Sequence, residues 1–203
     1  MGLRWSRAGG GVILTANGSG RGNAAEAVRL AFQQFAVRAV VSTGWCGALD
    51  PALEVGQIVV ADRVKTLEPA AEFPARRPAG NGEPHYGTIL TVDRFVASAE
   101  EKRRLRTTGA AAVEMEAAAV AAEACQRDLP FYCVRAVSDP AGFTIRTDLN
   151  RARFPDGRFS PVRIAAQAGL VPGRWLQLGR LWSWSRAAAE ALGEFFGRCR
   201  FDT

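Results

Sequence analysis

The chain has 203 residues, of which 48% are hydrophobic and 23% are charged. That length supplies one sizeable hydrophobic core but not two, so we expect a single domain over residues 1–203. No apolar run reaches the roughly 18 residues that a transmembrane helix needs, and the first residues hold no apolar segment of signal-peptide length. These features argue against a membrane-spanning or secreted chain, and we expect a cytoplasmic protein.

The cysteine and histidine content argues against a metal site. The four cysteines form no CxxC pair, and His85 is the single histidine. This spacing offers no set of metal ligands, so we expect reduced thiols, no metal and no cofactor.

The net charge of +6 is unevenly distributed along the chain, because residues 141–203 hold ten arginines and five acids. We interpret these residues as a basic, helical C-terminal extension of the same domain. A basic segment can contact nucleic acid, anionic lipid or only solvent, and charge runs usually mark a solvated face. Charge alone does not identify a partner, and we expect no nucleic-acid partner.

Short apolar strands alternate with helices along the first two thirds of the chain. Val12–Ala16 predicts a buried strand, and a glycine-rich turn then leads to a helix from about Asn23, whose side chain could cap it. Residues 116–127 predict an alanine-rich helix. Further strands are predicted over residues 37–44, 57–64, 88–93, 110–115 and 131–138. This alternation predicts an α/β fold with a mostly parallel or mixed central sheet flanked by helices.

The remaining segments carry weaker patterns. Residues 69–84 are rich in proline and predict a loop. Beyond Asp139 the periodicity falls, and helices resume near Pro161 and over residues 182–196. The last helix has a one-sided apolar stripe that we expect to pack on the domain.

The tryptophans of the C-terminal extension allow a second interpretation. Trp175, Trp182 and Trp184 lie beside arginines in the sequence, and amphipathic aromatics and arginines are favoured at membrane surfaces. Packing on the core is the simpler expectation, and membrane-surface contact is the alternative.

Two segments at predicted strand ends are candidates for ligand binding. Residues 18–23, GSGRGN, precede a helix, where backbone N–H groups favour an anion, so Gly20 and Arg21 are candidate anion-binding residues. Glycines in such a turn are also often only steric. Residues 43–51, TGWCGALDP, follow the next strand and supply three candidate substrate-binding residues, Trp45, Cys46 and Gly47. Because ligands bind at the carboxyl ends of strands in open parallel sheets, two such loops on adjacent strands reinforce each other.

Two carboxylates lie at the ends of predicted strands. Glu116 falls in the first turn of its helix, where the macrodipole favours a negative charge, and a helix-end acid would suffice to explain it. Asp139 follows a buried strand and precedes Pro140, a position that also suits a turn-forming residue. As a pair they point to a ligand site, because ligand groups gather at strand ends in this fold class. One carboxylate that binds sugar hydroxyls and another that donates a proton suit cleavage of an N-glycosidic bond.

Two long segments, VEMEAAAVAAEACQRDLPFYCVRAVSD and STGWCGALDPALEVGQIVVADRV, resemble the purine nucleoside phosphorylase superfamily. The resemblance is closest to its methylthioadenosine/S-adenosylhomocysteine nucleosidase branch and covers about residues 11–139, with Asp139 lying 23 positions after Glu116. The segment DLNRARFPDGRFS also resembles the hopanoid-associated nucleosidases, whose substrate is an adenosylated hopane lipid. The resemblance implies hydrolysis of an adenosine-type nucleoside by a homodimer or larger homo-oligomer.

The resemblance also implies which residues would bind the nucleoside. Phe95 would stack on the purine, and the backbone of Val96 would bond the base edge. Met115 would pack against the ribose, and Glu116 would accept hydrogen bonds from its 2′ and 3′ hydroxyls. Glu114, in the same motif, completes the expected substrate-binding residues.

The catalytic roles implied by the resemblance fall on the last predicted strand. Asp139 would protonate N7 of the departing base, Ser138 would orient Asp139, and Arg135 would shape the site near the attacking water. Protonating N7 stabilises the leaving group, so Asp139 must carry a proton when it acts.

The chain also departs from the family pattern. Phosphorylases of the superfamily have an arginine where this chain has Ser42, which favours water over phosphate as the nucleophile, although Arg21 keeps phosphorolysis open as an alternative. Trp45 stands where the nucleosidase branch has a small serine. The family opens with a strand followed by a glutamate that activates the water, whereas we expect this chain to start beyond it, since its first acid is Glu26. A non-catalytic nucleoside-binding protein is therefore a further alternative.

Overall fold

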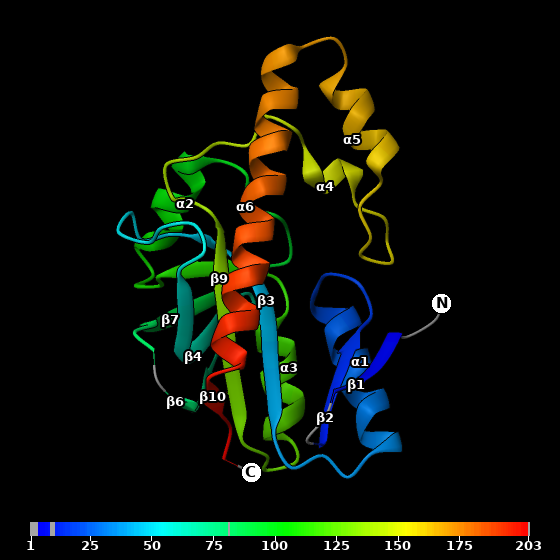
Figure 1. The fold of residues 1–203 in the computed structure, drawn as a ribbon, viewed down its shortest axis with the longest axis vertical. Coiled ribbons are helices and arrows are strands. Elements are labelled where there is room, and N and C mark those ends of the chain that lie inside the picture. The colour runs from blue at the N-terminus through cyan, green and yellow to red at the C-terminus, as the bar shows by residue number, and fades with distance from the viewer. Residues whose placement is uncertain (1–3, 9–10, 81, 203) are drawn as a thin grey trace.

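The computed structural model describes residues 4–8, 11–80 and 82–202 (Figure 1). The strands are β1 (Arg4–Ala8), β2 (Val12–Ala16), β3 (Val40–Ala48), β4 (Ile58–Leu67), β5 (Ala70–Pro74), β6 (Ala79–Gly80), β7 (His85–Thr91), β8 (Ala112–Glu114), β9 (Phe131–Asp139) and β10 (Cys199–Arg200). The helices are α1 (Arg21–Gln34), α2 (Ala99–Arg106), α3 (Ala117–Cys125), α4 (Leu149–Ala152), α5 (Pro161–Ala168) and α6 (Pro172–Phe196).

The centre of the molecule is a six-stranded sheet in the order β5-β4-β7-β8-β3-β9. An additional pairing of β4 with β9 closes β4, β7, β8, β3 and β9 into a ring. The pairs β3–β9, β4–β7 and β7–β8 are parallel, whereas β4–β5, β3–β8 and β4–β9 are antiparallel. The predicted α/β fold with a mixed sheet is confirmed.

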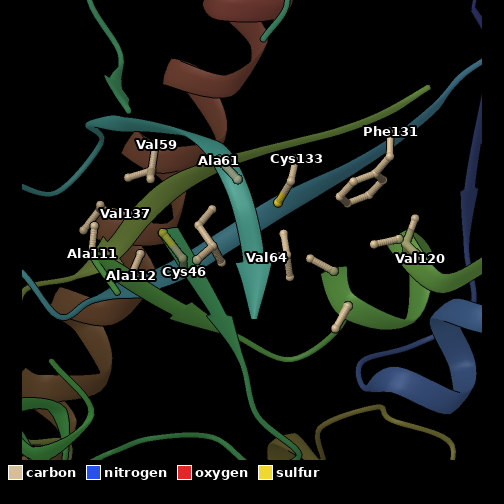
Figure 2. Close-up of a cluster of buried hydrophobic side chains, with 14 of the residues drawn as sticks. Cys46, Val59, Ala61, Val64, Ala111, Ala112, Val120, Phe131, Cys133 and Val137 are labelled. Carbon is tan, nitrogen blue, oxygen red and sulfur yellow. The ribbon is translucent and has the colours of Figure 1, made fainter. Parts of the chain in front are cut away.

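Helices cover this sheet on different sides. The C-terminal half of α6 runs along β9 and β3, and α3 packs on β3 with α1 against it (Figure 1). The buried positions of α3 are mostly alanine, so its backbone can lie close to the strands. The core between them combines β-branched and small side chains, including Val59, Val64 and Cys133 (Figure 2). Such residues suit strands that are buried on both faces.

The start of the chain differs from the prediction in three ways. Strand β2, predicted to be buried, exposes Val12 and Leu14 by 57% and 55%. Strand β2 pairs with β1 in a separate two-stranded sheet, so the glycine-rich turn does not follow a neighbour of β3 in the described residues. Helix α1 begins at Arg21, with Gly20 as its N-cap and no side-chain cap. The predicted cap by Asn23 is wrong, because its Nδ2 atom donates to the Ser19 carbonyl at 3.0 Å.

Strands also replace two predicted loops. Residues 69–84 contain β5 and β6, and β5 pairs with β4 at the edge of the sheet, where Pro74, its last residue, is tolerated. Residues 43–48, predicted as loop, complete β3. Helix α2 was not predicted at all, because its eight residues are dominated by charge.

The C-terminal extension forms α4, α5 and α6. Helix α6 begins ten residues earlier than predicted, at Pro172, in the first turn where proline is favoured. Ala188 is fully buried against the domain, as the predicted stripe requires. No helix within the described ranges is long and apolar enough to span a membrane.

Candidate functional site

Asp139 closes β9, and its side chain is buried. The Ser138 hydroxyl donates to Asp139 Oδ1 at 2.8 Å and lies 3.2 Å from the Cys46 carbonyl. Gly47 is the register partner of Asp139 on β3, and a Cβ atom there would lie 3.1 Å from Asp139 Oδ2. Because the strand pairing places a glycine beside Asp139, the carboxylate has room at this position.

Lys102 is the ionic partner of Asp139, and sequence reasoning missed it. Its side chain is fully buried, its ammonium pairs with Asp139 Oδ2, and the same Nζ donates to the Pro140 carbonyl at 2.9 Å. A buried ammonium is tolerated where a carboxylate and further acceptors surround it. The available signal was helical spacing, since Lys102 shares a face with Ala99 and Leu105.

Arg135 occupies the middle of β9 and is also buried. Its Nη2 atom donates to Glu114 Oε2 at 2.5 Å and to Ser42 Oγ at 2.8 Å. Gly44 lies opposite with φ +147°, and a Cβ atom there would approach Arg135 Nη1 to 2.7 Å. A glycine on β3 therefore makes room for each of the two functional side chains of β9.

Glu114 ends β8 and binds protein groups through both oxygens. Oε1 accepts from the Thr91 hydroxyl. Oε2 accepts from Arg135 and from the backbone N–H groups of Glu116 and Ala117, at 2.9 and 2.8 Å, where α3 begins. These contacts hold Arg135 and the first residues of α3 in place, so Glu114 acts as a positioning residue.

Glu116 is the N-cap residue of α3, and 23% of its side chain is exposed. Oε1 accepts from the Gly20 backbone N–H at 2.8 Å, and Oε2 lies 4.0 Å from Arg135 Nη2. Burial and then the neighbouring Glu114 charge raise the pKa of Glu116 above its ordinary value, although Arg135 opposes this. Glu116 is thus a partly accessible carboxylate, while the neighbouring Met115 is buried.

Phe95 and Val96 lie between β7 and α2. Val96 is buried in a cluster with Leu49 and Val113. The side-chain amide of Asn150 accepts from the Phe95 backbone N–H at 2.8 Å and donates to the Phe95 carbonyl at 2.9 Å. The C-terminal extension therefore holds the segment that carries Phe95, and sequence reasoning missed this residue of the tail motif.

The glycine-rich turn meets the site through Gly20, whose φ of +102° favours glycine. Arg21 forms an ion pair with Asp93, Nε lying 2.5 Å from Oδ1, so its charge is already matched. Arg153 Nη2 donates to the Ser19 carbonyl at 2.5 Å. Both arginines line an open hollow of about 220 Å³ at the start of α1.

The other two residues predicted on β3 face in different directions. Cys46 is buried in the core, and burial raises the pKa of its thiol. Trp45 is about half exposed. Of Trp45, Cys46 and Gly47, Gly47 lies beside Asp139. Cys46 contacts the site through its backbone carbonyl, which lies 3.2 Å from the Ser138 hydroxyl. Within the described part of the chain, no group of three or more His, Cys, Asp or Glu residues could hold a metal ion.

Comparisons with known proteins give a consistent family. The model of the phosphorylase superfamily matches residues 4–80 and 75–158. The chain is 32% identical over 188 residues to a 5'-methylthioadenosine/S-adenosylhomocysteine nucleosidase of Mycobacterium tuberculosis, covering 69% of this chain and 74% of that protein. Identity to the Staphylococcus aureus nucleosidase is 31% over 157 residues, covering 64% and 69%.

Solved structures show the same fold. The Colwellia psychrerythraea nucleosidase of the same name, in complex with adenine, superposes with a TM-score of 0.58 and 27% identity, covering 70% of this chain and 75% of that one. Futalosine hydrolase of Helicobacter pylori gives a TM-score of 0.55 at 21% identity, covering 66% and 78%. The second likeness concerns the fold alone.

Proposed function

The chain belongs to the phosphorylase superfamily, and on that premise we propose that it is a nucleosidase that hydrolyses the N-glycosidic bond of an adenosine-type nucleoside. One observation carries the proposal: the buried Asp139 ends β9, the partly exposed Glu116 follows β8, and Arg135 of β9 pairs with Glu114 and lies 4.0 Å from Glu116. The nucleosidase relatives support it, since their names give methylthioadenosine and S-adenosylhomocysteine as substrates.

The chemistry assigns the two carboxylates different tasks. As the bond between C1′ and N9 breaks, positive charge grows on the ribose and negative charge on the base. Asp139 protonates N7 and so stabilises the leaving base. Glu116 binds the ribose hydroxyls, and its negative charge also stabilises the cationic sugar. Phe95 stacks on the purine, and Met115 contacts the ribose.

Lys102 is placed to supply a proton to Asp139. Its ammonium contacts Asp139 Oδ2 directly, so a proton can move between the two groups without an intervening water. We propose that the proton passes from Lys102 through Asp139 to N7 as the base departs. The water that adds to C1′ releases one proton, which restores the ammonium, so the reaction neither gains nor loses protons overall.

Ser42 supports water as the nucleophile. It is buried, and its hydroxyl accepts a hydrogen bond from Arg135. A serine committed in this way offers no positive charge to a phosphate ion, and Arg21 is paired with Asp93. Both observations favour hydrolysis over phosphorolysis.

A nucleoside-binding protein without turnover is a second candidate. Within the described ranges, the carboxylates paired with Arg135 are Glu114 and Glu116. Glu114 is committed to protein donors and Glu116 to the ribose in our proposal, so activation of water has no dedicated carboxylate there.

The test is to incubate the purified protein with adenosine, methylthioadenosine and S-adenosylhomocysteine, with and without phosphate, and to measure free adenine. Adenine release without phosphate, lost in Asp139→Asn, supports the nucleosidase. Release that requires phosphate indicates a phosphorylase, and calorimetric binding without release indicates the binding protein.

The finer properties of the protein rest on the resemblance. We infer a homodimer or larger homo-oligomer, a cytoplasmic location and a 5′ substituent that includes methylthio, homocysteinyl or hopane-like groups. Sedimentation velocity tests the assembly. Comparison of kcat/KM across nucleosides that differ only at the 5′ position tests the substituent.

A further inference from the structure

The connection between α5 and α6 presents apolar side chains to solvent. We call residues 162–186 the α5–α6 tip. Leu170 is fully exposed, and Leu176 and Trp182 are 70% and 65% exposed. The full set of large exposed apolar residues in the tip is Val162, Leu170, Val171, Trp175, Leu176 and Trp182. Scattered exposed apolar residues are ordinary, but a cluster of them marks an interaction surface.

Three of these side chains line one hollow. Leu170, Trp175 and Leu176 line an open hollow of about 570 Å³ together with Gly169 and Pro172. Trp182 follows Trp175 by seven residues and so lies on the same side of α6. The Trp175 Nε1 atom donates to the Gly169 carbonyl at 2.9 Å, which leaves its ring free for apolar contact.

Arginines accompany the apolar side chains of the tip. Residues 157–189 contain five arginines and no aspartate or glutamate. Arg163, Arg180 and Arg186 are exposed, and the Arg186 guanidinium lies 5.2 Å from the Trp182 ring centroid. The tip therefore combines exposed apolar side chains with arginines and contains no acidic residue of its own.

The shape of the molecule leaves the tip accessible. The C-terminal half of α6 packs along β9, whereas its N-terminal half and α5 project beyond the end of the sheet (Figure 1). Trp184 does not belong to this surface, because its ring packs edge-on against Phe143 with centroids 4.8 Å apart. Of the three tryptophans that suggested membrane contact, two are available.

We propose that the α5–α6 tip binds the surface of an anionic lipid bilayer. Leucine, valine and tryptophan side chains enter the boundary between headgroups and acyl chains, while arginines contact the lipid phosphates. A symmetric contact with a second copy would bring two arginine-rich faces together, which like charges oppose. Nucleic acid would match the charge but gives exposed leucine and valine no apolar partner.

The experiment is flotation of the full chain with vesicles of phosphatidylcholine alone or mixed with phosphatidylglycerol. We expect the protein to float with the anionic vesicles, and less of it as salt rises. The triple variant Leu170→Ser, Leu176→Ser, Trp182→Ser should lose binding. The double variant Arg163→Gln, Arg180→Gln should weaken it roughly tenfold or more.

Matched controls are Leu67→Ser and Arg38→Gln, exposed residues outside the tip that should leave binding unchanged. Circular dichroism checks that each variant folds. Equal binding to neutral and anionic vesicles, or anionic binding that the tip variants retain, overturns the proposal. So does binding to no vesicle, and if the triple variant then dissociates an oligomer in sedimentation, the surface belongs to a second copy. Adenine release plays no part in this measurement, so it can fail independently of the nucleosidase proposal.

Discussion

The ammonium of Lys102 and the carboxylate of Asp139 form a buried ion pair at the end of β9. One partner comes from a short charged helix and the other from a central strand, so the pair ties α2 to the sheet. A pair of this kind is costly to break from one side, because the remaining charge stays buried without a counter-ion. The proposed acid therefore also contributes to the stability of the fold.

Lys102→Met should lower the free energy of unfolding by about 3–5 kcal/mol, since Asp139 is left unpaired. The double variant Lys102→Met, Asp139→Asn should recover much of that loss. Urea denaturation of the single and double variants measures the coupling. Arg104→Met, which removes an exposed ion pair with Glu100 on the same helix, should change stability by less than about 1 kcal/mol. Additive losses in the double variant would contradict the pairing.

Asp139→Asn should slow adenine release by roughly 10²–10⁴-fold at saturating substrate, because the amide cannot supply the proton to N7. Single-turnover kinetics measure the chemical step, and calorimetry should show that the nucleoside still binds. Ser138→Ala removes the hydroxyl at 2.8 Å from Asp139 Oδ1 and should cause a smaller loss. An unchanged rate in Asp139→Asn would show that another group protonates the base.

The sequence located the strands that carry the site but not all of its contacts. Asp139 and Glu116 were predictable because strand ends and helix starts are visible in apolar patterns. Lys102 was not, because a lysine among the charges of residues 100–106 has the pattern of a solvated face. Its helical spacing from Ala99 and Leu105 is a weak signal, and the tertiary fold, which turns that side of α2 toward β9, is what buries this lysine.

The same limit explains the errors around β5. Proline argues against a strand in the interior of a sheet, but β5 is an edge strand that needs one hydrogen-bonded neighbour. Edge position is a property of the assembled sheet and cannot be read from residues 70–74 alone. The pairing of β2 with β1 rather than with β3 is likewise a choice among partners that local sequence does not encode.

Glu116→Gln should stabilise the ligand-free protein at neutral pH. A carboxylate whose folded pKa is raised above its ordinary value of 4.5 contributes stability below 4.5 and loses it as pH rises through the folded pKa. The gain from the glutamine should therefore be largest at neutral pH and shrink toward pH 4. Thermal denaturation across this range measures it. The same variant should raise KM, because the amide binds ribose hydroxyls more weakly.

Gly44→Ala should displace the Arg135 guanidinium, because the new Cβ atom would lie 2.7 Å from Nη1 and the φ of +147° disfavours a side chain. We expect a lower free energy of unfolding, by about 1–3 kcal/mol, together with slower adenine release. The control is Gly22→Ala in α1, where a Cβ atom meets nothing within 4 Å. That change should stabilise by about 0.5–1 kcal/mol. Equal effects of the two changes would argue against a steric role for Gly44.

The Asn150 amide also limits how the purine can be recognised. It occupies the N–H of Phe95 and one of the two lone pairs of its carbonyl, so that residue has no backbone donor left when a nucleoside arrives. A base stacked on the Phe95 ring must then find its backbone donor on a neighbouring residue, and the ring itself does not distinguish adenine from other purines. Selectivity among bases should accordingly follow the Val96 backbone and Asp139, while the loop that holds the ring contributes affinity without discrimination.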